Sequence, residues 1–162
     1  MARDAIARQY DVDKNRLTLV CETESGNYRP GTITFFPKPG KSLDLRKMEE
    51  SLRATRLSGG TSMSMSYLEI TVLGELIVKD DAVQLKGAGT AQQFLLKQAK
   101  DDKNGSLNRL REVAAAGAKI VSVTGHVDGW SGRFPLVLSA LAKRSTDEPV
   151  VLFVTDFDIS KK

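Results

Sequence analysis

The sequence predicts an α+β fold, mostly antiparallel β with two helices, in which a strand–helix–strand unit precedes a small Greek-key barrel. Three observations lead to this prediction. Apolar and polar residues alternate over much of the chain, as in strands. Two segments instead repeat apolar residues at helical spacing. Gly74 and Gly125 fall inside strand-like runs, where the bends of a closed barrel would require glycine.

The first part of the chain carries few elements. Residues 1–15 show weak periodicity and are predicted to form a loose arm. The strand–helix–strand unit is placed at residues 16–65, with strands at 17–22 and 32–36 and a helix from Asp44. The Asp44 carboxylate suits the start of this helix because it can accept hydrogen bonds from first-turn amides.

Residues 66–162 are predicted to form the barrel, and one continuous compact domain is the alternative division. Ser106 is predicted to cap the second helix, at 107–116, and Gly117 suits the position just after its end. Alternation predicts strands at 63–79, 83–86, 93–97, 119–128, 134–141 and 149–157.

Composition excludes several classes of protein. The net charge is +4, but 20 acidic residues are mixed among 24 basic ones, which is typical of a solvated surface. The single cysteine, Cys21, excludes an intramolecular disulfide and a multi-cysteine zinc site, and its strand position predicts a buried thiol. No apolar run approaches the ~20 residues of a membrane span, so we expect a soluble protein. The polar N-terminus fits a cytosolic protein, or a mature exported protein with an added Met1.

Two segments resemble known families. Residues 31–52, beginning Gly-Thr-Ile-Thr-Phe-Phe, and then 67–74, Tyr-Leu-Glu-Ile-Thr-Val-Leu-Gly, resemble the opening strand, helix and strand of a heavy-metal-associated, ferredoxin-like domain. In that family the loop before the helix carries Cys-x-x-Cys, which binds soft metal ions. The matching loop here, residues 37–41, reads Pro-Lys-Pro-Gly-Lys without cysteine. The resemblance therefore implies a fold unit and no metal transfer.

The second half resembles the OB-fold barrels of bacterial binding domains. The resemblance rests on Gly74, on Phe94-Leu-Leu, on the helix at 107–116 and on residues 121–127, Val-Ser-Val-Thr-Gly-His-Val. It implies a five-stranded barrel that binds single-stranded nucleic acid, oligosaccharide or protein.

Metal-ligating residues are few. His126 and Asp128 form His-x-Asp on one strand face, and Met63 and Met65 could offer thioethers to Cu(I). Ordinary strand positions, with the His126 tip in water and the methionines packed, are the competing interpretation. We therefore predict no cofactor and keep copper handling as the last alternative.

One surface is predicted to bind a partner. An indole on a turn can stack on a base, a sugar or a protein, and basic residues beside it would favour an anionic ligand. The residues of this candidate surface are Trp130, Arg133, Phe134, Lys143 and Arg144.

Residue chemistry gives no recognisable catalytic set, since His126 lacks an assigned nucleophile or orienting group. The predicted function is a non-catalytic binding or structural module, with a protein partner or a homo-oligomer, because exposed sheet edges accept partner strands. Single-stranded nucleic-acid binding by the barrel is the alternative.

Overall fold

The chain divides into two compact units, Met1–Ser64 and Met65–Lys162, each of which is described by itself. Sequence predictions for the strand at 134–141 and most of the helix from Asp44 lie outside the described residues. The computed structural model describes residues 12, 17–21, 31–34, 40–42, 44, 54, 68–100, 102–117, 119–127 and 149–159.

In the first unit, β1 (Thr18–Cys21) and β2 (Gly31–Thr34) form an antiparallel pair. The two strands predicted here are therefore confirmed, with β2 described as far as Thr34. Of the predicted first helix the structure describes Asp44 and Ala54, and Ala54 has helical backbone. The predicted burial of the Cys21 thiol concerns a side chain outside the described set.

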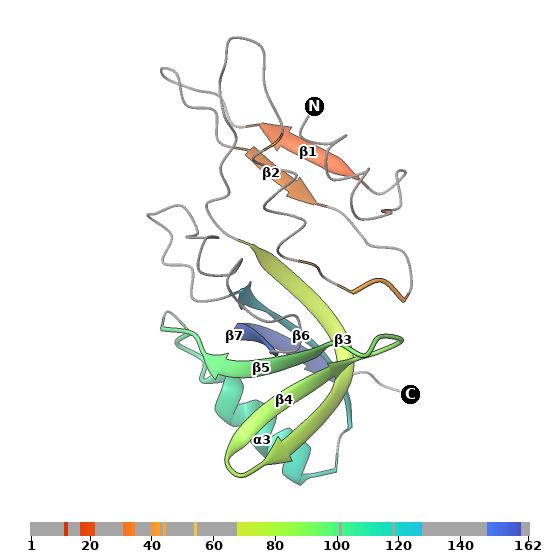
Figure 1. Ribbon diagram of the computed structural model, residues 1–162. Coiled ribbons are helices and arrows are strands. Elements are labelled where there is room, and N and C mark those ends of the chain that lie inside the picture. Colours follow the sequence, from red (N-terminus) through yellow and green to blue (C-terminus); the bar gives the residue numbers. More distant parts are fainter. Residues whose placement is uncertain are drawn as a thin grey trace. The chain divides into compact units, whose positions relative to one another are not determined.

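Five strands of the second unit close into a barrel in the order β3-β4-β5-β7-β6, and β6 pairs with β3 (Figure 1). The helix α3 (Ser106–Ala115) lies between β5 and β6 in the chain and contacts β7, β3 and β5. The prediction of a barrel-containing, mostly β protein of the α+β class is confirmed. The strands are β3 (Glu69–Lys79), β4 (Ala82–Gly87), β5 (Gln93–Gln98), β6 (Ile120–Val127) and β7 (Val150–Ile159).

The antiparallel prediction is wrong for one pair of strands. β5 and β7 run parallel, with Phe94 opposite Val150 and Gln98 opposite Val154, so the barrel is mixed. A parallel neighbour needs a crossover connection, and here α3 and β6 both intervene between the two strands. Alternation along each strand identifies the strands but does not specify which of them become neighbours.

The barrel interior is filled by aliphatic side chains at alternating positions. Leu85, Val121, Val123, Leu152 and Val154 are fully buried, each with no measurable exposure. Burying one such side chain contributes roughly 1.5–3 kcal/mol. The alternation predicted for the strands therefore places the core inside the barrel.

Gly74 and Gly125 lie where the backbone of a neighbouring strand leaves no room for a side chain. A Cβ on Gly74 would overlap the carbonyl oxygen of Lys86, and a Cβ on Gly125 would overlap that of Phe153. The β6–β7 register also shifts between Thr124 and Gly125, which marks a β-bulge. Gly125 therefore lies beside a bulge, as predicted for a bend of the barrel, whereas Gly74 lies in a regular register at a close approach of β3 and β4.

The start of α3 differs from the prediction. Ser106 is the first helical residue rather than the cap, since Gly105 precedes it in the left-handed conformation with φ 63°. The capping carboxylate comes from Asp102, whose Oδ2 accepts the backbone N–H of Ser106 at 2.6 Å. The Ser106 hydroxyl donates instead to the carbonyl oxygen of Thr155 in β7, at 3.2 Å. A loop carboxylate therefore replaces the predicted local cap. Gly117 follows the helix with φ 91°, as predicted.

None of the helices in the described part of the chain has the length and apolar character needed to cross a membrane.

Candidate functional site

Among the strands that the structure describes, the first half of β3 has a neighbour on one side only. β3 pairs with β6 from Glu69 to Glu75, but it pairs with β4 only from Gly74 onward. With respect to the described strands, the segment of β3 before Gly74 is therefore an edge of the barrel. The sequence analysis expected exposed sheet edges that could accept a partner strand, and this segment of β3 is such an edge.

Hydrogen bonds at the two ends of the β3–β6 ladder fix the direction of each backbone group. The Val127 N–H donates to the Leu68 carbonyl at 2.9 Å, and the Leu76 N–H donates to the Lys119 carbonyl at 2.8 Å. Antiparallel partners alternate between hydrogen-bonded and non-hydrogen-bonded pairs. The even-numbered residues of β3 therefore bond to β6, and the odd-numbered residues direct their N–H and C=O groups away from it.

On the far side of β3, the Ala88 N–H donates to the Leu73 carbonyl at 2.8 Å. Before Leu73, no backbone group among the described residues bonds with the N–H or C=O of Glu69 or Thr71. We call these four backbone groups the β3 edge. An edge of this kind is a template for an added strand.

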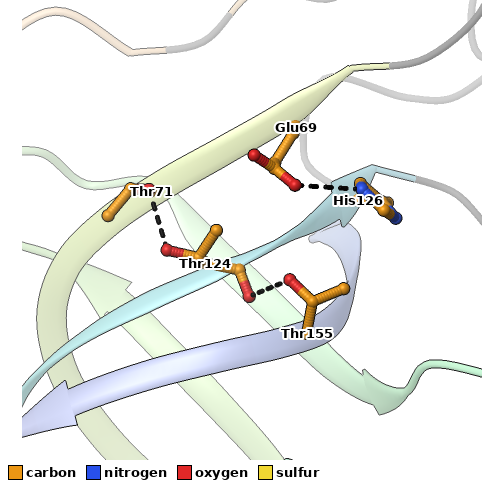
Figure 2. A network of polar contacts seen from close by, with 5 residues as sticks. All are labelled: Glu69, Thr71, Thr124, His126 and Thr155. Atoms are coloured by element: carbon orange, nitrogen blue, oxygen red, sulfur yellow. Dashed lines mark hydrogen bonds and ion pairs between the residues drawn. The ribbon is translucent and has the colours of Figure 1, made fainter. Parts of the chain in front are cut away.

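Side-chain contacts between β3 and β6 hold the two strands together (Figure 2). The hydroxyls of Thr71 and Thr124 lie 2.8 Å apart, and His126 Nε2 lies 3.1 Å from Glu69 Oε2. Both are non-hydrogen-bonded pairs, in which side chains approach closely. The Thr155 hydroxyl donates to the Thr124 carbonyl at 3.3 Å and extends the network to β7. The β3 edge therefore lies on a strand that is firmly positioned.

His126 does not have the solvent-exposed tip that the sequence suggested. The residue is 9% exposed, and its ring contacts the Glu69 carboxylate, whose side chain is half exposed. The Glu69 partner was missed because β3 and β6 are far apart in sequence and only their register brings the two side chains together.

The predicted metal candidates are not brought together by the described structure. Asp128, Met63 and Met65 lie outside the described residues. Within the described ranges, no group of three or more His, Cys, Asp or Glu side chains could hold a metal ion.

Apolar side chains flank the β3 edge. Ile70 and Val72 share the inward parity but are only half-buried, whereas Leu76 further along the same face is buried. Leu73, on the outer face, is 48% exposed. An added strand would cover apolar area as well as backbone groups, which favours a protein partner.

The part of β7 beyond its pairing with β5 also lacks a described strand neighbour on that side, but a helix covers it. β5 pairs with β7 as far as Val154, and beyond it α3 lies against β7. The Ser106 hydroxyl bonds the Thr155 carbonyl, and the Arg109 guanidinium lies 5.2 Å from the centre of the Phe157 ring. Helix α3 therefore covers this side, whereas no described element lies along the β3 edge.

The outer face of β4 and β5 is less suited to the alternative of single-stranded nucleic-acid binding. Such binding combines positive charge with aromatic rings on which bases stack. Lys86 lies opposite Glu75, which offsets part of its charge. No aromatic ring occurs among the six outward residues of these two strands, which are Ala82, Gln84, Lys86, Gln93, Leu95 and Lys97.

The surface that the sequence predicted to bind a partner cannot be placed. Its five residues lie in a stretch outside the described residues, between β6 and β7, and they are Trp130, Arg133, Phe134, Lys143 and Arg144.

Comparison of the chain with protein-family models, with curated proteins and with solved structures finds no match.

Proposed function

We propose that this chain is a non-catalytic protein-binding module, a subunit of a larger assembly, which accepts an extended strand at the β3 edge. The observation that carries the proposal is that the N–H and C=O groups of Glu69 and Thr71, on a firmly positioned strand, have no backbone partner among the described residues. Addition of a strand to an exposed edge gives affinity through main-chain hydrogen bonds and specificity through alternate side chains.

The barrel is proposed to be of the OB type. The strand order β3-β4-β5-β7-β6 and the helix between the third and fourth strands support this assignment. For the first unit, the proposal is the strand–helix–strand arrangement of the heavy-metal-associated domains without their metal ligands. Neither assignment fixes a function, because one fold serves many. The β3 edge is therefore the feature that distinguishes protein binding from the other uses of such a barrel.

The test is a single substitution that removes a donor from the edge without disturbing the β3–β6 ladder. The Thr71 N–H points away from β6, and proline is tolerated where the missing N–H would face outward. Thr71→Pro should therefore fold and lose partner binding. Thr71→Val is the matched control, because it also removes the hydroxyl that contacts Thr124 but keeps the N–H.

Partners would be captured from a lysate of cells that express the protein, cross-linked and identified by mass spectrometry. Proteins bound by the parent and by Thr71→Val, but lost with Thr71→Pro, would support the proposal. Equal capture by the folded Thr71→Pro variant would reject it. Val72→Pro removes an N–H that bonds to β6 and should therefore unfold the barrel. It serves as the comparison variant in which the β3–β6 ladder itself is broken.

A further inference from the structure

We infer that the strand that occupies the β3 edge is the β3 edge of a second copy of this chain, giving a two-fold symmetric dimer. This inference rests on the proposed function and names its partner. It follows from the positions of the backbone groups that have no partner in the described part of the chain, which lie on two residues of the same strand separated by a single residue, Ile70.

Two copies of this edge fit one another in one antiparallel register. If Ile70 faces Ile70 of the second copy, Glu69 faces Thr71 of that copy, and Thr71 faces Glu69. In a hydrogen-bonded antiparallel pair the two residues exchange both N–H···O bonds. Each Glu69–Thr71 pair then forms two bonds, and every unpaired group of both edges is satisfied. An isologous contact of this kind closes at two copies and does not propagate into a fibre.

The side chains agree with this register. Glu69 lies beside the Thr71 hydroxyl of the second copy rather than beside its Glu69, so like charges do not face one another. The two Ile70 side chains meet at the symmetry axis as a non-hydrogen-bonded pair, in which side chains are closest. Ile70 is half-buried on an inward face, and the second Ile70 would cover part of what remains accessible.

The two neighbouring registers fit less well. If Glu69 faced Glu69 of the second copy, like charges would lie opposite one another. If Thr71 faced Thr71 of the second copy, the Glu69 N–H would face the Leu73 carbonyl of that copy. This carbonyl already accepts a hydrogen bond from the Ala88 N–H of its own chain. The short contact predicts a dimer that dissociates on dilution, since small interfaces are typically weak.

The first experiment is disulfide trapping at the symmetry axis. In a Cys21→Ser background, which removes the one native thiol, Ile70→Cys places two thiols opposite one another. Cα atoms of a non-hydrogen-bonded pair lie about 4.5 Å apart, within the range that a disulfide spans. Oxidised glutathione should convert this variant to a covalent dimer on a non-reducing gel.

Val72→Cys in the same background is the matched control. In the inferred register the two Val72 positions are four residues apart along the strands, roughly 14 Å at about 3.4 Å per residue, too far for a disulfide. Trapping at Ile70 that is at least tenfold faster than at Val72 is the expected result. Equal rates at both positions, or no trapping at either in folded protein, would overturn the inferred dimer.

Sedimentation equilibrium on the unmodified chain provides a second readout. The parent should shift from monomer to dimer with rising concentration, and folded Thr71→Pro should stay monomeric. A parent that is monomeric at every concentration would overturn self-pairing. The proposed function would survive that result if Thr71→Pro still abolished capture of a different protein, so the two ideas fail separately.

Discussion

Replacing Gly125 with alanine tests the barrel geometry that creates the β3 edge. The new Cβ would overlap the carbonyl oxygen of Phe153 and lie 3.0 Å from both the Phe153 carbonyl carbon and Leu152 Cγ. Two of these three atoms are backbone, and β7 is held at this level by β5 on one side and β6 on the other. Neither strand can move without breaking ladder hydrogen bonds, so the added methyl is not accommodated by a side-chain rotation.

The magnitude follows from opposing effects. Overpacking costs about 1–3 kcal/mol. Weakening of one or two ladder hydrogen bonds adds about 0.5–1.5 kcal/mol each. Replacing glycine also lowers the conformational entropy of the unfolded chain, which stabilises the folded protein by about 0.4–1 kcal/mol. We expect Gly125→Ala to lower the free energy of unfolding by about 2–3 kcal/mol, and Gly125→Val by at least as much.

Chemical denaturation followed by tryptophan fluorescence measures this change, because the single tryptophan, Trp130, belongs to the same unit as Gly125. A thermal melt should show a decrease in Tm of roughly 10–20 °C. Gly89→Ala is the control: it has φ 71° but open space around the added Cβ, so only a dihedral cost of about 1–2 kcal/mol applies. A Gly125→Ala protein as stable as the parent would refute the close approach of β6 and β7.

Three further substitutions have defined outcomes. Gly74→Ala should destabilise by about 2–3 kcal/mol in denaturant titration, because its Cβ would overlap the Lys86 carbonyl oxygen, and no change would contradict the β3–β4 register. Glu69→Gln should change stability by less than about 1 kcal/mol, since the Glu69 side chain that contacts His126 is half exposed, and a larger loss would show a buried role for the carboxylate. Burial acts to raise the pKa of Asp102, but hydrogen bonds from Ser106, Asn104 and Gln98 outweigh it and hold that pKa below its ordinary value. The ionised carboxylate therefore stabilises the fold above the ordinary Asp pKa, and this contribution is lost as pH falls through the lowered one. Asp102→Ala should cost about 0.5–2 kcal/mol at pH 7, and urea titrations at falling pH should show the difference from the parent shrink.

Several parts of the fold could be predicted from the sequence because their causes are local. Alternation identified every described strand of the barrel, and the spacing of Leu107 and Leu110 identified α3. The two strand glycines pointed to closure because a glycine within a strand is unfavourable unless a bend or close approach requires it. These predictions needed only the neighbours of each residue along the chain.

The rest depends on contacts between distant segments. The parallel β5–β7 pair, the His126–Glu69 contact and the Asp102 cap each join residues whose proximity follows from strand order or loop path. The β3 edge depends on the difference between two registers, since β6 begins pairing at Glu69 and β4 only at Gly74. No pattern within residues 69–73 indicates that the pairing with β4 begins only at Gly74.

Residue-resolved amide hydrogen exchange tests the central claim, that the β3 edge is the binding site, most directly. In dilute protein the Ile70 and Val72 amides, which bond to β6, should be protected, while the Glu69 and Thr71 amides should exchange at nearly the rate of an unstructured chain. When the protein is concentrated, or its captured partner is added, Glu69 and Thr71 should become protected and Ile70 and Val72 should not change. Protection of Thr71 in dilute monomer, or rapid exchange of Thr71 within a formed complex, would contradict the account.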